Sequence, residues 1–284
     1  MKFTDVEQVL GSLDKLPTLP VIYTKLLRLL QSPDSTIHAI SNIIAEDQVI
    51  AAKVLQYVNS ALYGFPQRIG SLPRAIVILG FNAIKNLVLA TSVWDLFQKV
   101  QAGHQFNKES FWKHSIGCAV ASRVLAEAAD LKNPEDVFTG GLLHDIGKII
   151  QAGYFPEQFN RVIDLVDQTG LPMVEAEKRV FGFDHAQIGT AVATRWRFPQ
   201  ETVNMIALHH LSNGTTGLNK TIAAVHVGNI LATALSLGYS GEKLVPSVHD
   251  KAWETLGLGL GSLELVMGKV VKLYKENIAI LESS

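Results

Sequence analysis

Side chains that could bind a metal ion recur through the middle of this 284-residue sequence. His144 and Asp145 are adjacent, in a run Gly-Leu-Leu-His-Asp-Ile-Gly-Lys that ends at Lys148. Imidazole and carboxylate ligands suit Fe, Mn, Zn or Ni, whereas structural zinc sites normally include thiolates. The residues therefore predict a catalytic or regulatory site for one or two divalent transition-metal ions, with the candidate ligands His114, His144, Asp145, His185, His209 and His210.

Composition limits the classes of protein to which the chain can belong. Hydrophobic residues make up 48% of it, and 25 basic residues against 26 acidic ones give a net charge of −1. No overall field would attract nucleic acid or an anionic membrane, so both are disfavoured as partners. The single cysteine, Cys118, cannot form an intrachain disulfide and fits a small buried residue. We expect a soluble, cytoplasmic protein, without a signal peptide or an apolar run of the ~18 residues that span a membrane.

Apolar residues recur at helical spacing in nearly every segment, which predicts an all-α fold. One helix is expected to begin at Asn133, with Pro134 in its first turn, and to run on through His144 and Asp145. The two ligands would then lie ~100° apart on one helix and point into the same pocket. Other helices are expected to start at Asn107, at Asp184 and after Pro199, each shortly before a candidate ligand.

A polar stretch over residues 98–108 is the candidate boundary between two parts of the chain. We predict an N-terminal helical subdomain over residues 1–104 and a metal-binding helical subdomain over residues 105–284, together forming one unit. In the first part, Asp34 and Ser35 are expected to cap a helix. Residues 64–71 are expected to break the chain before a helix that starts at Leu72.

The order of the candidate ligands resembles the HD superfamily of metal-dependent phosphohydrolases, particularly its HD-GYP branch, which hydrolyses cyclic di-GMP. The first half of the chain resembles the HDOD family of bacterial signalling modules. The matching segments are Leu16–Pro20, Ile43 and Ile44 with Asp47, Lys53–Leu55, Asn59–Ala61, Ala75 and Ile76, and Leu79 with Gly80. This resemblance covers roughly residues 10–210. It implies an HD-superfamily helical bundle that acts as a regulatory or scaffolding module with a protein partner in signalling.

The sequence departs from both families. HDOD members often lack the HD ligands, which this chain keeps. After His210 there is no acid at Leu211 and no Gly-Tyr-Pro, and the final aspartate of the superfamily would correspond to Asn229. An amide offers a neutral oxygen in place of a carboxylate, which would weaken a divalent site. Asn229 is therefore a weaker candidate ligand than the other six.

The resemblance leaves three functions open. The first is a bacterial regulatory module with a retained metal site. The second is a metal-dependent phosphohydrolase acting on a nucleotide or cyclic dinucleotide, in which metal-activated water attacks the phosphoester and Lys148 stabilises its oxygens as a catalytic residue. The third is DNA binding by the N-terminal helices, because short helices joined by turns can imitate a helix-turn-helix. It is weakened by the small number of basic residues there, which are scattered over several helices: Lys25, Arg28, Lys53, Arg68, Arg74 and Lys85.

Each candidate also has a simpler interpretation. The histidines could be buried imidazoles that hydrogen-bond to backbone carbonyls, although five in the order of a known ligand pattern favour a metal. Lys148 could be an exposed lysine. We expect His226 to be a core histidine, and His38, His104 and His249 to lie on solvated faces. Asp47 and Asn59 are expected to tie helix ends through hydrogen bonds to the backbone.

Overall fold

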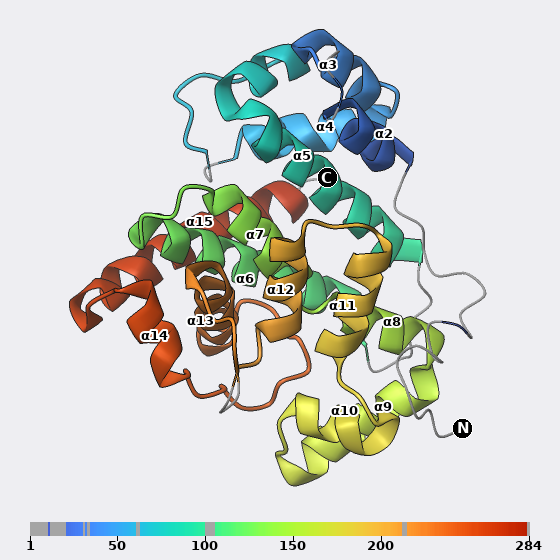
Figure 1. Ribbon diagram of the computed structural model, residues 1–284, viewed down its shortest axis with the longest axis vertical. Coiled ribbons are helices and arrows are strands. Elements are labelled where there is room, and N and C mark those ends of the chain that lie inside the picture. The colour runs from blue at the N-terminus through green and yellow to red at the C-terminus, as the bar shows by residue number, and fades with distance from the viewer. Residues whose placement is uncertain are drawn as a thin grey trace. The chain divides into compact units, whose positions relative to one another are not determined.

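The computed structural model describes residue 11 and residues 21–30, 32, 35–60, 63–99, 106–211 and 215–282. Regular structure in these ranges is helical throughout, with no strand (Figure 1). The predicted all-α fold is therefore confirmed. The described residues form two compact units, one made of residues 97–271 and the other of residues 21–96 with 272–282. The predicted boundary between residues 104 and 105 lies outside the described residues.

The smaller unit contains α2 (Val21–Leu30), α3 (Ile37–Ala45), α4 (Gln48–Val58) and most of α5 (Leu72–Lys99). Its helices pack through buried side chains such as Tyr23, Ile44 and Val54. The predicted cap of α3 is wrong by one residue. Thr36 holds the extended conformation just before the helix, and its hydroxyl accepts a hydrogen bond from the backbone nitrogen of Ala39 at 3.1 Å. Ser35 precedes this position, and Asp34 lies outside the described residues.

Asp47 and Asn59 have the structural roles that the sequence predicted. The Asp47 carboxylate caps α4 by accepting hydrogen bonds from the backbone nitrogens of Val49 and Ile50, at 3.0 and 3.1 Å. The Asn59 amide joins the end of α4 to the following loop. It donates to the carbonyls of Leu55 and Ile69, at 2.7 and 2.9 Å, and accepts from the Ile69 backbone nitrogen at 2.7 Å. Both ends of α4 are therefore fixed by side chains.

Helix α5 begins at Leu72, directly after the predicted break, and kinks at Gly80, where φ is 81° and ψ is 167°. Only glycine adopts this conformation without strain. Contrary to expectation, residues 72–94 are long and apolar enough to cross a membrane, with a mean hydropathy of 1.7. Of that window 61% is buried inside the protein, and core helices of soluble proteins pass the same test. The burial is typical of a core helix.

The larger unit is a bundle built around α6 (Lys108–Ala128), which packs on α7 (Pro134–Leu143) and α13 (Lys220–Ala234). Cys118 is buried in α6, as expected. At Gly228 in α13 a Cβ atom would come within 2.3 Å of Ser122 Oγ, so glycine permits the close approach of α13 to α6. The remaining helices are α8 (Ile146–Tyr154), α9 (Pro156–Thr169), α10 (Met173–Phe181), α11 (His185–Arg195), α12 (Gln200–Leu208), α14 (Asp250–Leu256), the short 3₁₀ helix Leu260–Ser262 and α15 (Leu263–Glu282), whose residues from Lys272 onward belong to the smaller unit.

Candidate metal centre

His144 and Asp145 lie in the turn between α7 and α8, so the prediction that they sit inside one helix is wrong. The backbone of Asp145 leaves the helical conformation, at φ −97° and ψ 13°, and α8 starts at the next residue. Asn133 precedes α7 with Pro134 in its first turn, but the Asn133 side chain makes no capping hydrogen bond. The turn still brings His144 Nε2 to within 3.2 Å of Asp145 Oδ2.

Helix α6 supplies His114. Its start is fixed as predicted, because the Asn107 side chain accepts a hydrogen bond from the Ser110 backbone nitrogen at 2.8 Å. The His114 ring lies 5.5 Å from the His144 ring, measured between centroids. His114 Nε2 is 3.0 Å from Oδ1 of Asn229, which comes from α13. The structure thus places the weaker candidate Asn229 beside His114, with its side-chain oxygen directed at the imidazole.

Helix α11 supplies His185 at its first position. Asp184 caps this helix as predicted, in a capping box with Gln187. At Gly147 in α8, a Cβ atom would lie only 1.9 Å from the His185 carbonyl oxygen. Glycine is therefore required for α8 to pack against α11 at this point. This packing places His185 Nε2 at 3.0 Å from Asp145 Oδ1.

The last two candidate ligands follow α12, which starts after Pro199 as predicted. His209 Nε2 lies 3.5 Å from Asp145 Oδ1 and 3.2 Å from His185 Nε2. His210 Nε2 lies 3.0 Å from the same His185 atom. The end of α12 thus adds two imidazoles to the group around Asp145.

The six stronger candidates form two overlapping groups, and Asp145 belongs to both. In each group the ligand atoms all lie within 4.8 Å of one another. The groups are Asp145 with His185, His209 and His210, and His114 with His144 and Asp145. Residues from α6, the α7–α8 turn, α11 and the end of α12 therefore meet at one place. Their role as ligands stays a prediction.

The hydrogen bonds of the imidazole rings suit a metal ion. The Nδ1 atoms of His144 and His209 each donate to a backbone carbonyl at 2.7 Å, from Gly141 and Ile206. The opposite Nε2 atoms face the centre of the group and are the atoms that would bind a metal ion once each ring is neutral. The Nε2 atoms of His209 and His210 lie 3.2 and 3.0 Å from Nε2 of His185, close enough to accept the proton that His185 carries in the metal-free protein. A divalent cation would take the place of that proton. His144 Nε2 is also buried without a hydrogen-bond partner. Such a donor set fits a divalent transition metal.

Glu177 is a functional candidate that the sequence interpretation missed. Its carboxylate is buried in α10, and Oε2 accepts hydrogen bonds from the backbone nitrogen and Nδ1 of His185. The signal was present in the sequence. Glu177 falls at helical spacing with the apolar residues Met173, Ala176 and Phe181, which are also buried. A carboxylate on the apolar face of a helix requires a buried partner.

Lys148 is buried, so the interpretation as an exposed lysine is wrong. Its Nζ donates to Asp145 Oδ2 at 2.8 Å. Burial alone would lower the pKa of Lys148, but the carboxylates of Asp145, Glu242 and Glu177 outweigh it and raise that pKa. Lys148 therefore places a fixed positive charge beside the ligand cluster.

The imidazoles of the cluster fall into two sets by pKa, because burial and neighbouring charges act on them to different extents. Burial lowers the pKa of His114 and of His209 to about 3. Burial also lowers the pKa of His144, but the Asp145 carboxylate outweighs this effect and raises the pKa to about 10. Burial also opposes a charge on His185, yet Glu177 and Asp145 raise its pKa to about 9. In the metal-free protein, protons on these two rings therefore balance the buried carboxylates.

The other histidines take structural positions. His226 is a core histidine, as expected, because its Nδ1 bonds to the His209 carbonyl at 2.8 Å and its Nε2 accepts from the His249 backbone nitrogen at 3.1 Å. The first of these bonds helps to fix the backbone of His209. His38 is exposed, as expected. His249 is half-buried instead of solvated, and His104 lies outside the described residues.

Comparisons with known proteins identify similar chains. The family model for the HDOD domain matches residues 16–212. The crystal structure of an HDOD domain protein with unknown function from Geobacter sulfurreducens is 27% identical, with a TM-score of 0.78, and the match covers 94% of this chain and 96% of that one. A Shewanella amazonensis structure, provisionally named a phosphohydrolase, is 26% identical, with a TM-score of 0.74 and coverage of 94% and 97%. An uncharacterized protein of Treponema pallidum is 25% identical over 199 residues, which are 70% of this chain and only 38% of that relative.

Proposed function

Because the chain belongs to the HDOD family, whose model matches residues 16–212, we propose that it is a signal-transduction module with a retained metal site. The observation that carries the proposal is the convergence of buried imidazoles and the Asp145 carboxylate, with ligand atoms within 4.8 Å of one another. The module would hold one or two divalent transition-metal ions, from Fe, Mn, Zn or Ni, and would act through a protein partner.

One ion would be held by Asp145 with the imidazoles of His185, His209 and His210, and a second by His114, His144 and Asp145. A bound ion would supply positive charge in place of the imidazole protons. The ligands come from separate elements, so metal binding would stabilise the packing of α6, the α7–α8 turn, α11 and α12 against one another. The stability of this unit would then depend on metal supply, which is a property that a regulatory module can use.

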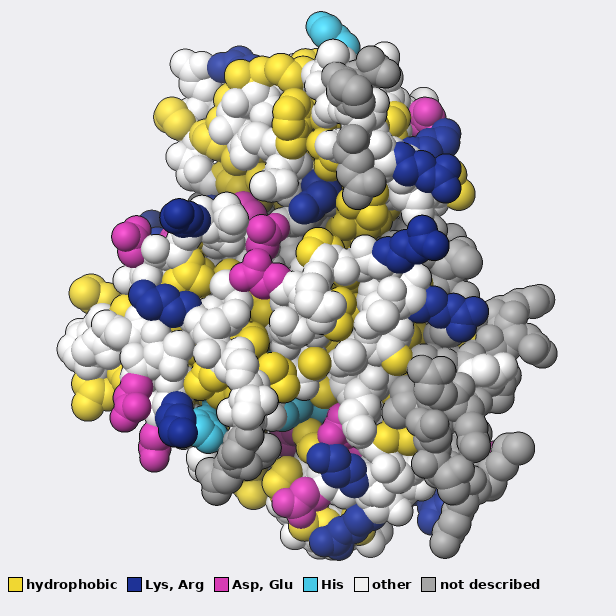
Figure 2. All heavy atoms as spheres, viewed as in Figure 1, with side chains coloured by type: hydrophobic (Ala, Val, Ile, Leu, Met, Phe, Trp, Pro, Cys, Tyr) yellow, Lys and Arg dark blue, Asp and Glu magenta, His cyan; other side chains and the backbone are white. Residues whose placement is uncertain are grey.

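The burial of the site favours a regulatory role over turnover. His144, Asp145, His185 and His209 are each 0% exposed. Few histidine side chains reach the face of the molecule shown in Figure 2. A phosphoester substrate would need access to the ions, and among the described ligands only His210 is part-exposed. The neutral amide of Asn229 also provides less charge than a carboxylate would.

A metal-dependent phosphohydrolase is the second candidate function, and the position of Lys148 favours it. A buried ammonium group beside a ligand carboxylate could also neutralise the oxygens of a bound phosphoester. The metal, when bound, would activate water for attack on the phosphoester of a nucleotide or cyclic dinucleotide. The provisional name of the Shewanella relative points the same way.

Metal content tests the site that both functions require, and turnover of a phosphoester separates the two functions. We would express the chain with added Fe, Mn, Zn or Ni, measure bound metal by mass spectrometry, and locate the ions by anomalous scattering. The proposal expects bound metal in the wild type, a loss in His185→Ala, and no change in His38→Ala, which removes an exposed histidine. A chain that stays metal-free under every condition would refute it. Turnover of cyclic di-GMP by the loaded protein, abolished in His144→Ala, would establish the phosphohydrolase instead.

A further inference from the structure

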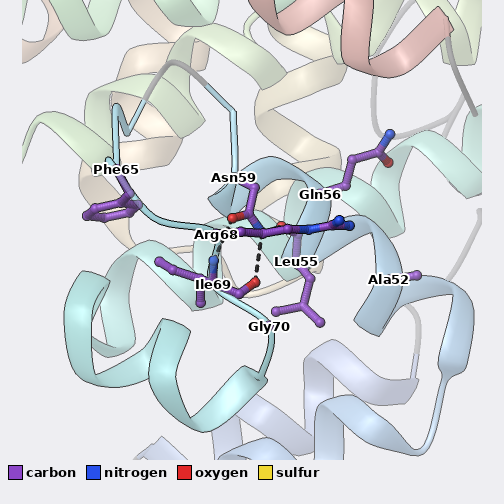
Figure 3. A pocket seen from close by; sticks show the side chains of 8 residues that line it. All are labelled: Ala52, Leu55, Gln56, Asn59, Phe65, Arg68, Ile69 and Gly70. Carbon is purple, nitrogen blue, oxygen red and sulfur yellow. Dashed lines mark hydrogen bonds between the residues drawn. The ribbon is translucent and has the colours of Figure 1, made fainter.

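A second candidate site lies within the smaller unit. A cavity of about 920 Å³ lies between α4 and the loop after it (Figure 3). It is lined by Ala52, Leu55, Gln56, Asn59, Phe65, Arg68, Ile69 and Gly70. Its volume is in the range of small-molecule binding sites. The described lining residues are mostly apolar, with two amides and one guanidinium, and they include none of the candidate metal ligands. This site is therefore separate from the proposed metal centre.

The Asn59 amide fixes the shape of the cavity. Its two donated hydrogen bonds and one accepted hydrogen bond all go to backbone atoms of Leu55 and Ile69, and Figure 3 shows the amide between α4 and the loop. The Ile69 side chain is 2% exposed, which anchors the loop a second time. Asn59 is thus a support for the cavity. Arg68, which directly precedes Ile69, is thereby held at a defined position beside α4.

The side chain of Arg68 extends along α4 past Leu55 toward Gln56 (Figure 3). Arg68 is exposed and forms no ion pair or hydrogen bond with any residue that the structure describes. No acidic side chain is among the described residues that line the cavity. A guanidinium group offers five donors in a planar fork that matches a phosphate or a carboxylate. The charge of the cavity therefore suits an anionic group.

Phe65 provides a second recognition element. Its half-buried ring lines the cavity and lies parallel to the Tyr63 ring, at an interplanar angle of 2° and a centroid distance of 6.2 Å. In Figure 3, Phe65 and the end of the Arg68 side chain lie on opposite sides of Asn59. An aromatic face at one end and a guanidinium at the other suit a ligand with a planar ring and an anionic group.

We propose that this cavity binds a nucleoside monophosphate, with the phosphate on Arg68 and the base against Phe65. Bases stack on aromatic side chains whatever their identity, and a guanidinium binds phosphate through paired hydrogen bonds. The proposal goes beyond the metal-centred function. It assigns the smaller unit a ligand of its own, bound without any metal.

The test is calorimetric titration of the full chain with GMP and AMP, and with guanosine and inorganic phosphate as probes of each half of the ligand. We expect both nucleotides to bind, and each half alone to bind at least about tenfold more weakly. Arg68→Gln should weaken GMP binding about tenfold or more, because a charge-assisted pair is lost. Arg74→Gln is the matched control. Arg74 is also exposed and forms no ion pair with the residues that the structure describes, but it does not line the cavity, so GMP binding should not change.

Phe65→Leu separates the aromatic contact from the charge, and we expect a loss of about fivefold in GMP affinity with phosphate binding unchanged. Circular dichroism would show that each variant is folded. Absence of binding to both nucleotides overturns the proposal, as does an equal loss in Arg68→Gln and Arg74→Gln. Binding that disappears with a chelator or in His185→Ala would also overturn it, because the ligand would then belong to the metal centre. Intact GMP binding in a metal-free chain would support this cavity while refuting the metal site.

Discussion

The Glu177 carboxylate holds His185 at two points, accepting one hydrogen bond from its backbone nitrogen at 2.9 Å and another from its ring Nδ1 at 2.7 Å. The two bonds fix the start of α11 and the orientation of the imidazole together. Nε2 of His185 is consequently directed at Asp145 Oδ1, 3.0 Å away. Carboxylates that bind the far nitrogen of a ligand imidazole raise its basicity and set its tautomer.

Glu177→Gln should therefore weaken metal binding about 10-fold to 100-fold while leaving the fold intact. The glutamine oxygen can still accept one hydrogen bond from His185, but the negative charge is lost. Competition with a chelator of known affinity measures the effect. Glu175→Gln is the control, because Glu175 lies in the same helix and is exposed. Equal affinities for the two variants would show that Glu177 does not position a ligand.

Substitutions of single ligands should distinguish the two groups. His114→Ala removes a ligand of one group only, so we expect the chain to keep the ion held by His185, His209 and His210. Asp145→Asn takes a charged ligand from both groups and should abolish metal binding. The measurement is metal content per chain after equilibrium dialysis. A chain with Asp145→Asn that retains a full complement of metal would contradict the assignment of Asp145.

Asn229→Asp should strengthen the group that contains His114. The Asn229 oxygen lies 3.0 Å from His114 Nε2, so a carboxylate there would add negative charge beside the ion. We expect metal affinity to rise about tenfold. Asn219→Asp makes the same chemical change at the N-cap of the same helix, outside the cluster, and should leave affinity unchanged. An affinity that falls in Asn229→Asp would argue against a metal at this position.

Gly147→Ala should destabilise the larger unit. The new methyl group would overlap the His185 carbonyl oxygen, which belongs to the backbone and cannot rotate away. Overpacking of this kind costs about 1–3 kcal/mol in the free energy of unfolding. Urea denaturation measures the loss. Gly268→Ala, in helix α15 with nothing within 4 Å of the added Cβ, should be neutral or slightly stabilising. An unchanged midpoint for Gly147→Ala would contradict the close packing of α8 on α11.

The sequence predicted the helical fold and the identities of the six clustered side chains because both depend on local chemistry. Caps at Asn107 and Asp184 are also local, and both are present. The turn at His144 and Asp145 was not predictable in this way. Neither residue is proline or glycine, which are the residues that mark a helix break most strongly in a sequence.

Burial of polar groups was the other limit of the sequence interpretation. Lys148 and Glu177 carry charges that composition would place in solvent. Both are buried because an oppositely charged or hydrogen-bonding partner nearby in the chain compensates each of them. The Asp145 carboxylate accepts from Lys148, and His185, eight residues along the chain, pairs with Glu177. The spacing alone is compatible with such pairs, but only the tertiary structure shows that they are buried.

Asp145 is the one residue that belongs to both ligand groups. Two divalent ions would therefore share a single carboxylate, and the first to arrive would neutralise the charge that attracts the second. Filling would occur in two steps of falling affinity, with no single concerted transition. The metal occupancy of such a module would change gradually over a broad range of metal concentration, with one ion bound at low concentration and two at high concentration.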